Sequence, residues 1–112
     1  MKAVLFEIKG KKYSCKPTFE VIEAIESSTG KGTLQLVREI INADYKMSEL
    51  VKIVSCIVGA QSKELSMDKI ADEVMGNVKT FSVPVVTYLV ECNQGAVELE
   101  TDVTDGGTEG NV

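Results

Sequence analysis

Three carboxylates, Glu20, Glu23 and Glu26, recur at intervals of three residues and are the first place to look for chemistry. Two acids can perform general acid and base catalysis when burial drives their pKa values apart. At 100° per residue, Glu20 and Glu23 lie on the polar side of a helix, so a solvated face is the favoured interpretation for both. Glu26 instead falls between Phe19 and Ile22, on the apolar side. We therefore expect Glu26 to have a partner, because an unpaired buried charge costs several kcal/mol.

A structural role suits Glu26 better than a catalytic one. Its carboxylate could accept backbone N–H groups at the start of the next helix, or pair with a Lys or Arg side chain. The helix that carries it has clear ends, with Pro17 at or near the first helical position and Gly30 just past the last. We predict a helix over residues 17–30, clasped to the following helix by Glu26. Its core-facing residues are expected to be Phe19, Val21, Ile22 and Ile25.

Groups for nucleophilic or metal chemistry are scarce. The chain has no histidine, which is the commonest general base and metal ligand. Its three cysteines, Cys15, Cys56 and Cys92, are widely spaced and include no C-x-x-C pair, so buried reduced thiols are the favoured interpretation. No S-x-x-K is accompanied by a supporting motif, and residues 30–33 (Gly-Lys-Gly-Thr) are too short for a phosphate-binding loop. We predict a protein that is not an enzyme, with no cofactor, metal or small-molecule substrate.

Charge is distributed unevenly along the chain. All 12 Lys and Arg residues precede Gln94, as do 12 of the 17 acids, so the net charge of −5 belongs to the last residues. A neutral body with an acidic tail is a poor match for nucleic acid, whose binding requires neutralised phosphates. The five acids of the tail are Glu98, Glu100, Asp102, Asp105 and Glu109.

Length and hydropathy set the domain organisation. A chain of 112 residues with 44% hydrophobic content suits one core, so we predict a single domain over residues 1–93 and a disordered acidic tail over 94–112. The longest nearly apolar run, residues 53–60, is far shorter than the ~20 residues of a membrane span. The first residues do not read as a secretory signal. We expect a soluble protein in the cytoplasm of a bacterial host, with no membrane partner.

The predicted elements give an α+β class that is mostly α. Val4, Phe6 and Ile8 alternate with other residues before a break at residues 9–12, which predicts an N-terminal β-hairpin. A compact bundle of four to five short helices is expected, over residues 17–30, 33–41, 48–59, 66–76 and, with a strand as the alternative, 81–92. The third is apolar over more than one stripe, which is typical of a central helix. Residues 81–92 are also rich in strand formers, but a helix with Ser82 as its cap and Pro84 in its first turn is favoured.

These elements carry a family resemblance. The hairpin, the Pro17-Thr18-Phe19 entry, the Ile25-Glu26 pair and Thr29-Gly30, followed by a helix over residues 34–41 and an apolar third helix, resemble the small tail assembly chaperones of tailed phages and gene transfer agents. The similarity is sharpest over residues 13–41. The strand-like residues 80–90 and the long acidic tail depart from it.

The resemblance implies a non-enzymatic chaperone that binds the long tape-measure protein while tail-tube subunits polymerise around it. Its partners would be the tape-measure and tail-tube proteins, with self-association also open. Apolar surface for a client could come from parts of residues 81–90 or the outer side of the third helix, although ordinary core is the alternative for both. Two other interpretations remain: a minor tail or tail-tube component retained in the virion, and a generic helical interaction module.

Overall fold

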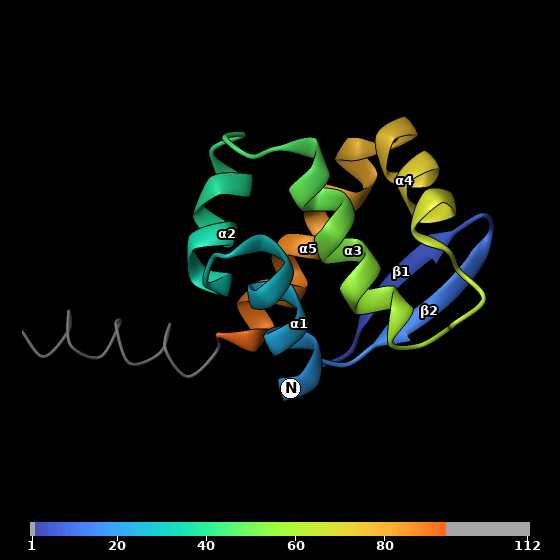
Figure 1. Ribbon diagram of the computed structural model, residues 1–112, viewed down its shortest axis with the longest axis horizontal. Helices are drawn as coiled ribbons and strands as arrows, with labels where there is room; N and C mark the ends of the chain where they lie inside the picture. Colours follow the sequence, from blue (N-terminus) through green and yellow to red (C-terminus); the bar gives the residue numbers. More distant parts are fainter. Residues whose placement is uncertain (1, 94–112) are drawn as a thin grey trace, which may run out of the picture.

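A two-stranded hairpin and five helices make up the fold in a computed structural model, which describes residues 2–93 (Figure 1). The predicted α+β class, mostly α, is therefore confirmed. The predicted acidic tail lies outside the described residues. In chain order the elements are β1 (Val4–Ile8), β2 (Lys11–Cys15), α1 (Phe19–Thr29), α2 (Thr33–Ile41), α3 (Met47–Gly59), α4 (Met67–Gly76) and α5 (Val78–Cys92).

The hairpin pairs β1 with β2 in antiparallel register and turns on two residues only. Lys9 and Gly10 have φ angles of 52° and 80°, the left-handed pair that a tight two-residue hairpin turn requires. Lys11 and Lys12, expected in the turn, belong to β2 instead, and Lys11 pairs with Ile8. Val4, Phe6 and Ile8 are buried on the face turned toward α5, as their alternation predicts.

Helix α1 begins two residues later than predicted. Its N-cap is Thr18, whose hydroxyl accepts the Val21 N–H at 3.2 Å, so Pro17 precedes the cap and is not in the first helical turn. The threonine side chain has an oxygen that can accept a hydrogen bond from a free N–H group of the first turn, whereas the proline side chain has no such acceptor. At the other end Gly30 has a φ of 72° and donates its N–H to the Glu26 carbonyl at 2.8 Å.

The buried stripe of α1 is rotated away from the predicted one. Val21 and Ile25 are buried, Ile22 is half-buried, and the Phe19 side chain is 74% exposed. At 100° per residue, the direction midway between Val21 and Ile25 lies about 140° from Phe19 and about 120° from Glu26. The prediction that Phe19 and Glu26 share the core side of the helix is therefore wrong.

Helix α3 occupies the centre of the molecule, as Figure 1 shows. It contacts α1, α4, α5 and β2, and this is why its apolar residues extend over more than one stripe. Its buried apolar residues are Leu50, Val51, Ile53, Val54, Ile57 and Val58.

Helix α5 confirms helix over strand for residues 81–92, but its start differs from the prediction. It begins at Val78, so Pro84 lies inside the helix, and Ser82 is no cap because its hydroxyl donates to the Val78 carbonyl at 2.8 Å. Tyr88 anchors the helix to the hairpin. Its ring meets Phe6 edge to face with centroids 6.3 Å apart, and its hydroxyl donates to the Lys16 carbonyl at 3.2 Å.

Candidate functional site

The clasp predicted at Glu26 is not formed by that residue. The Glu26 side chain is exposed, and among residues 2–93 it makes no hydrogen bond or ion pair. Of the other residues predicted to be structural, Pro17 is buried ahead of the α1 cap and Gly30 ends the helix. The correction follows from the rotated stripe of α1, which turns Glu26 toward water.

Lys31, in the joint after Gly30, connects the helices instead. Its ammonium group lies 2.9 Å from a Glu39 carboxylate oxygen on α2 and 2.7 Å from one of Glu49 on α3. The other Glu49 oxygen accepts the Lys46 N–H at the start of α3 at 3.4 Å. The hydrogen bond from Lys31 lowers the pKa of Glu49 despite the burial of that side chain, and bonds to Glu49 and Glu39 raise the pKa of Lys31. The network is a structural clasp of three elements.

The sequence carried a weak signal for this clasp. Lys31 is the single charged residue in the short joint between two predicted helices, where a long cation can reach both neighbours. Which acids it reaches depends on how α2 and α3 pack, and that is a tertiary property.

The thiols are poorly placed for nucleophilic chemistry. Cys15, Cys56 and Cys92 are all free, with Cys15 buried and the other two half-buried. Burial raises the pKa of Cys15 to about 11 and that of Cys92 to about 11. Because the thiolate is the reactive form, such thiols remain protonated near neutral pH.

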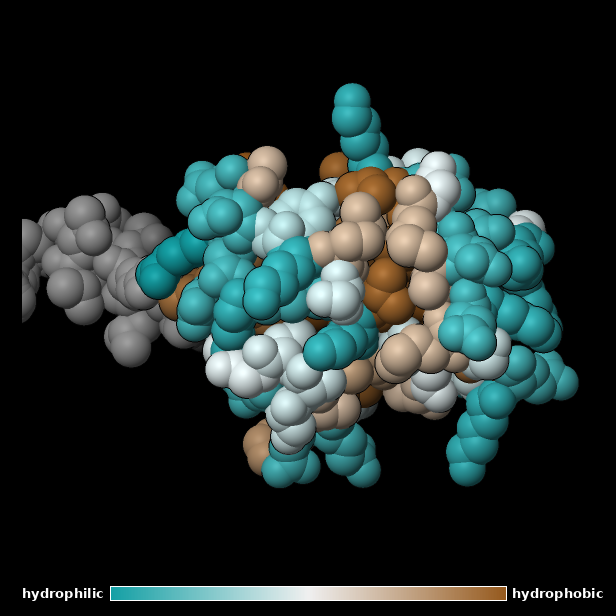
Figure 2. Space-filling model, turned by 45° about the horizontal axis from the view of Figure 1, so that its top comes forward, coloured by the Kyte–Doolittle hydropathy of each residue, from teal (hydrophilic) through white to brown (hydrophobic). Residues whose placement is uncertain are grey.

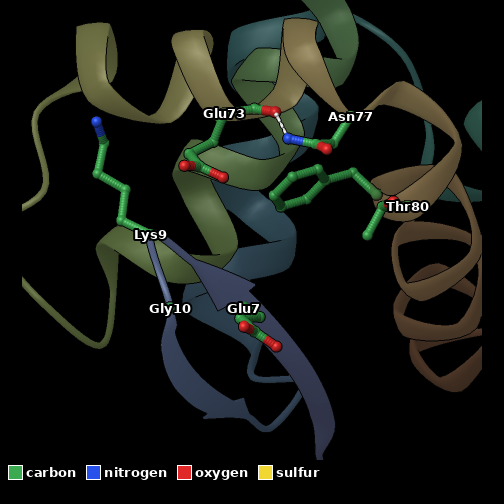
Figure 3. Close-up of a pocket in the computed structure, with 7 residues that line it drawn as sticks. Glu7, Lys9, Gly10, Glu73, Asn77 and Thr80 are labelled. Atoms are coloured by element: carbon green, nitrogen blue, oxygen red, sulfur yellow. Dashed lines mark hydrogen bonds between the residues drawn. The ribbon is translucent and has the colours of Figure 1, made fainter.

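A polar hollow lies where the hairpin turn meets the junction of α4 and α5 (Figure 3). It is lined by Glu7 on β1, Glu73 on α4 and Thr80 on α5, among others. The side-chain amide of Asn77 donates a hydrogen bond to the Glu73 carbonyl at 3.0 Å. This amide therefore satisfies a backbone carbonyl at the C-terminal end of α4. Within residues 2–93 no group of three His, Cys, Asp or Glu side chains could hold a metal ion. The hollow offers no nucleophile with a neighbouring base.

The strongest candidate for a functional surface is an apolar groove between α3 and α4. Met47 and Val51 line it from α3, and Met67, Ala71 and Met75 line it from α4. Each set follows a spacing of four residues, which places its members on one face of the helix. Met67 and Met75 are 56% and 55% exposed. Figure 2 shows an apolar band crossing this face of the molecule, with hydrophilic residues on both sides.

The methionine side chains make the surface of this groove adaptable. Its unbranched side chain adapts to different partners, and exposed methionines are common where a protein binds amphipathic helices of varied sequence. Exposed apolar side chains that gather in one place favour an interaction surface more than the same side chains scattered singly. The groove, defined by these five residues, is therefore our candidate interaction surface.

Sequence reasoning missed the groove in part. The outer side of the third helix was one of the two expected surfaces, and Met47 lies on it, whereas Val51 is buried and lies at the bottom of the groove. Helical spacing over residues 66–76 also predicts that Ile70, Ala71, Val74 and Met75 all face inward, but Met75 is 55% exposed. Five apolar residues of α4 cover too wide an arc to be buried together, and only Ile70 and Val74 reach the core.

A second apolar patch lies between α2 and α5, on the other expected surface. Ile41 and Val83 are its most exposed members, and Val83 is 70% exposed. The hydroxyl of Thr87, beside them, donates to the Val83 carbonyl at 2.9 Å, so its donor is already used within α5. Apart from Ser82, the side chains that line this patch are β-branched and therefore stiffer than methionine.

Comparison of the chain with models of protein families, with curated proteins and with solved structures finds no match. Among the described residues, no helix combines the length and apolar character needed to cross a membrane.

Proposed function

We propose that this chain is a non-enzymatic tail assembly chaperone of a tailed phage or prophage, which binds the tape-measure protein in the cytoplasm of the host. In this role it would keep the client soluble while tail-tube subunits assemble. The observation that carries the proposal is the methionine-lined groove between α3 and α4.

The chemistry of the groove fits such a client. A long helical protein exposes apolar stripes until its partners cover them, and an amphipathic helix binds by laying that stripe into an apolar groove. A holding chaperone needs to release the helix later, so an adaptable surface suits it better than a rigid pocket. We take the client to be the tape-measure protein because residues 13–41 resemble those of tail assembly chaperones.

Co-expression tests the proposal. The tape-measure protein of the same genome is produced with and without this chain, and its soluble fraction is measured after centrifugation. We expect a several-fold larger soluble fraction when the chain is present. Equal solubility in both cultures would contradict the chaperone function, and a genome with no tape-measure gene nearby would weigh against it.

The alternative of a retained tail component makes a different prediction. Mass spectrometry of purified particles should find no copies of a chaperone, whereas a structural component would be present in stoichiometric amounts. We expect the chain to be missing from the finished particle.

A further inference from the structure

The two rims of the groove between α3 and α4 carry opposite charges. Lys52 stands on the α3 side, and Asp68 stands on the α4 side. Asp72 is exposed one turn further along α4, on the same face as Asp68. The nearest acid on α3, Glu49, is turned away into its ion pair with Lys31. The groove thus has an apolar floor, one basic rim and one acidic rim.

The floor is long enough for about two turns of a helix. Met67 and Met75 are eight residues apart on α4, which corresponds to about 12 Å at 1.5 Å per residue. Two helical turns present two or three apolar side chains on one stripe, with charged side chains flanking the stripe on both sides. The side chains of such a helix would reach the rims while its stripe covers the methionines.

We infer that the groove binds a partner helix whose apolar stripe is flanked by acidic side chains on one side, facing Lys52, and by basic side chains on the other, facing Asp68 and Asp72. Reversing a helix end to end exchanges its two flanks. The rims therefore also fix the direction in which the helix lies. This inference rests on the proposed function in taking the client to be helical.

Charge complementarity selects this occupant over the chain's own last residues. Residues 94–112 contain five acids and no base, so they could match the Lys52 rim but would repel the rim of Asp68 and Asp72. A helix with flanks of both signs matches both rims at once.

Synthetic helical peptides provide the test. Three peptides of about 21 residues share one leucine stripe and differ only in their flanks: acidic with basic, acidic on both sides, or basic on both sides. Their Kd values for the full-length protein are measured by fluorescence anisotropy at low salt. We expect the mixed peptide to bind about tenfold more tightly than either uniform peptide, from the sum of three weak exposed ion pairs.

Charge reversal sharpens the test because it predicts a change of preference. Lys52→Glu makes both rims acidic and should shift the preference to the basic peptide. D68K/D72K makes both rims basic and should shift it to the acidic peptide. Asp68 and Asp72 are exposed and Lys52 is half-buried at the edge of the groove, so the fold should survive, as an unchanged circular dichroism spectrum would verify. An order of affinities that stays the same after either reversal would overturn the inference.

The remaining outcomes separate this inference from the proposed function. If no peptide binds but the chain still keeps the tape-measure protein soluble, the inference about the flanks fails and the chaperone function stands. If the mixed peptide binds as expected but tape-measure solubility is independent of the chain, the inference stands and the chaperone function fails. Concentration-dependent dimerisation that is lost in the charge-reversed variants would identify a second copy as the occupant and overturn the inference.

Discussion

At the scale of single residues, Gly30 shows how one backbone conformation joins two helices. Its φ of 72° lies in the left-handed region, where a Cβ atom is strained even though open space surrounds the position. Gly30→Ala should therefore lower the free energy of unfolding by about 1 kcal/mol, measured by urea denaturation.

Gly76→Ala is the matched control for this change. Gly76 ends α4, has open space around it and is not in the left-handed region. Alanine there should be neutral or slightly stabilising, because it favours the helix and restricts the unfolded chain. Equal losses of stability in the two variants would show that backbone strain at Gly30 is not the cause.

The Lys31 clasp predicts how stability depends on pH. Because the folded-state pKa of Glu49 is lowered from its ordinary 4.5, its contribution is present above that pH and is lost as pH falls through the folded value. The pKa of Lys31 is raised from 10.5, so its contribution is present below that pH and is lost as pH rises through the folded value. Between pH 4.5 and pH 10.5, both Glu49 and Lys31 therefore contribute to stability through the clasp.

Glu49→Gln should therefore lower the melting temperature at pH 7 and flatten its fall below pH 4.5. Glu26→Gln is the control, since that side chain is exposed and makes no ion pair among the described residues. We expect the control to melt like the wild type. A Glu49→Gln variant with the wild-type acid profile would contradict the assignment of this carboxylate to the clasp.

At the scale of elements, α5 holds a proline where a helix least tolerates one. Pro84 lies inside the helix and has no N–H for the carbonyl four residues earlier, so that backbone bond is missing. Pro84→Ala should restore the bond and raise the free energy of unfolding by about 1 kcal/mol, part of the ~3 kcal/mol difference in helix propensity being offset by lost packing. Urea denaturation measures the change. A destabilised variant would mean that the proline ring contributes more through packing than it costs the helix.

The elements themselves were predictable from local signals. Alternation located the hairpin, and stop residues such as Gly30 located the C-terminal ends of the helices. The N-terminal ends were less predictable: Ser66 does cap α4, but Pro17 and Ser82 do not mark the starts of α1 and α5. The faces of the helices were less predictable. In α1 the stripe of Phe19 and Ile22 and the stripe of Val21 and Ile25 both fit a helix, and only packing against α3 decides between them.

The groove, like the buried face of α1, could not be predicted from the sequence alone. The helical spacing of Met67, Ala71 and Met75 is visible in the sequence, but their exposure depends on which side of α4 meets α3. The clasp at Lys31 also depends on tertiary placement, because its two acids lie on different helices. Local chemistry therefore predicted the elements, whereas the candidate site arises from how they pack.

At the scale of the whole molecule, one small core supports two exposed apolar surfaces. The hairpin and α5 pack on one side of α3, while α4 packs on α3 and leaves the methionines of the groove uncovered. Exposed apolar side chains reduce solubility, so their concentration in the groove is best explained by a partner that covers them. We propose a helix of the tape-measure protein for that role.

The most direct test compares two surface variants in the co-expression experiment. M67Q/M75Q makes the groove polar while keeping side-chain length and helix propensity, and I41T/V83T changes the patch between α2 and α5 as a control. We predict that M67Q/M75Q folds normally but loses most of its ability to keep the tape-measure protein soluble, whereas I41T/V83T retains it. Full solubilisation by M67Q/M75Q would contradict our proposal that the groove between α3 and α4 binds the tape-measure protein.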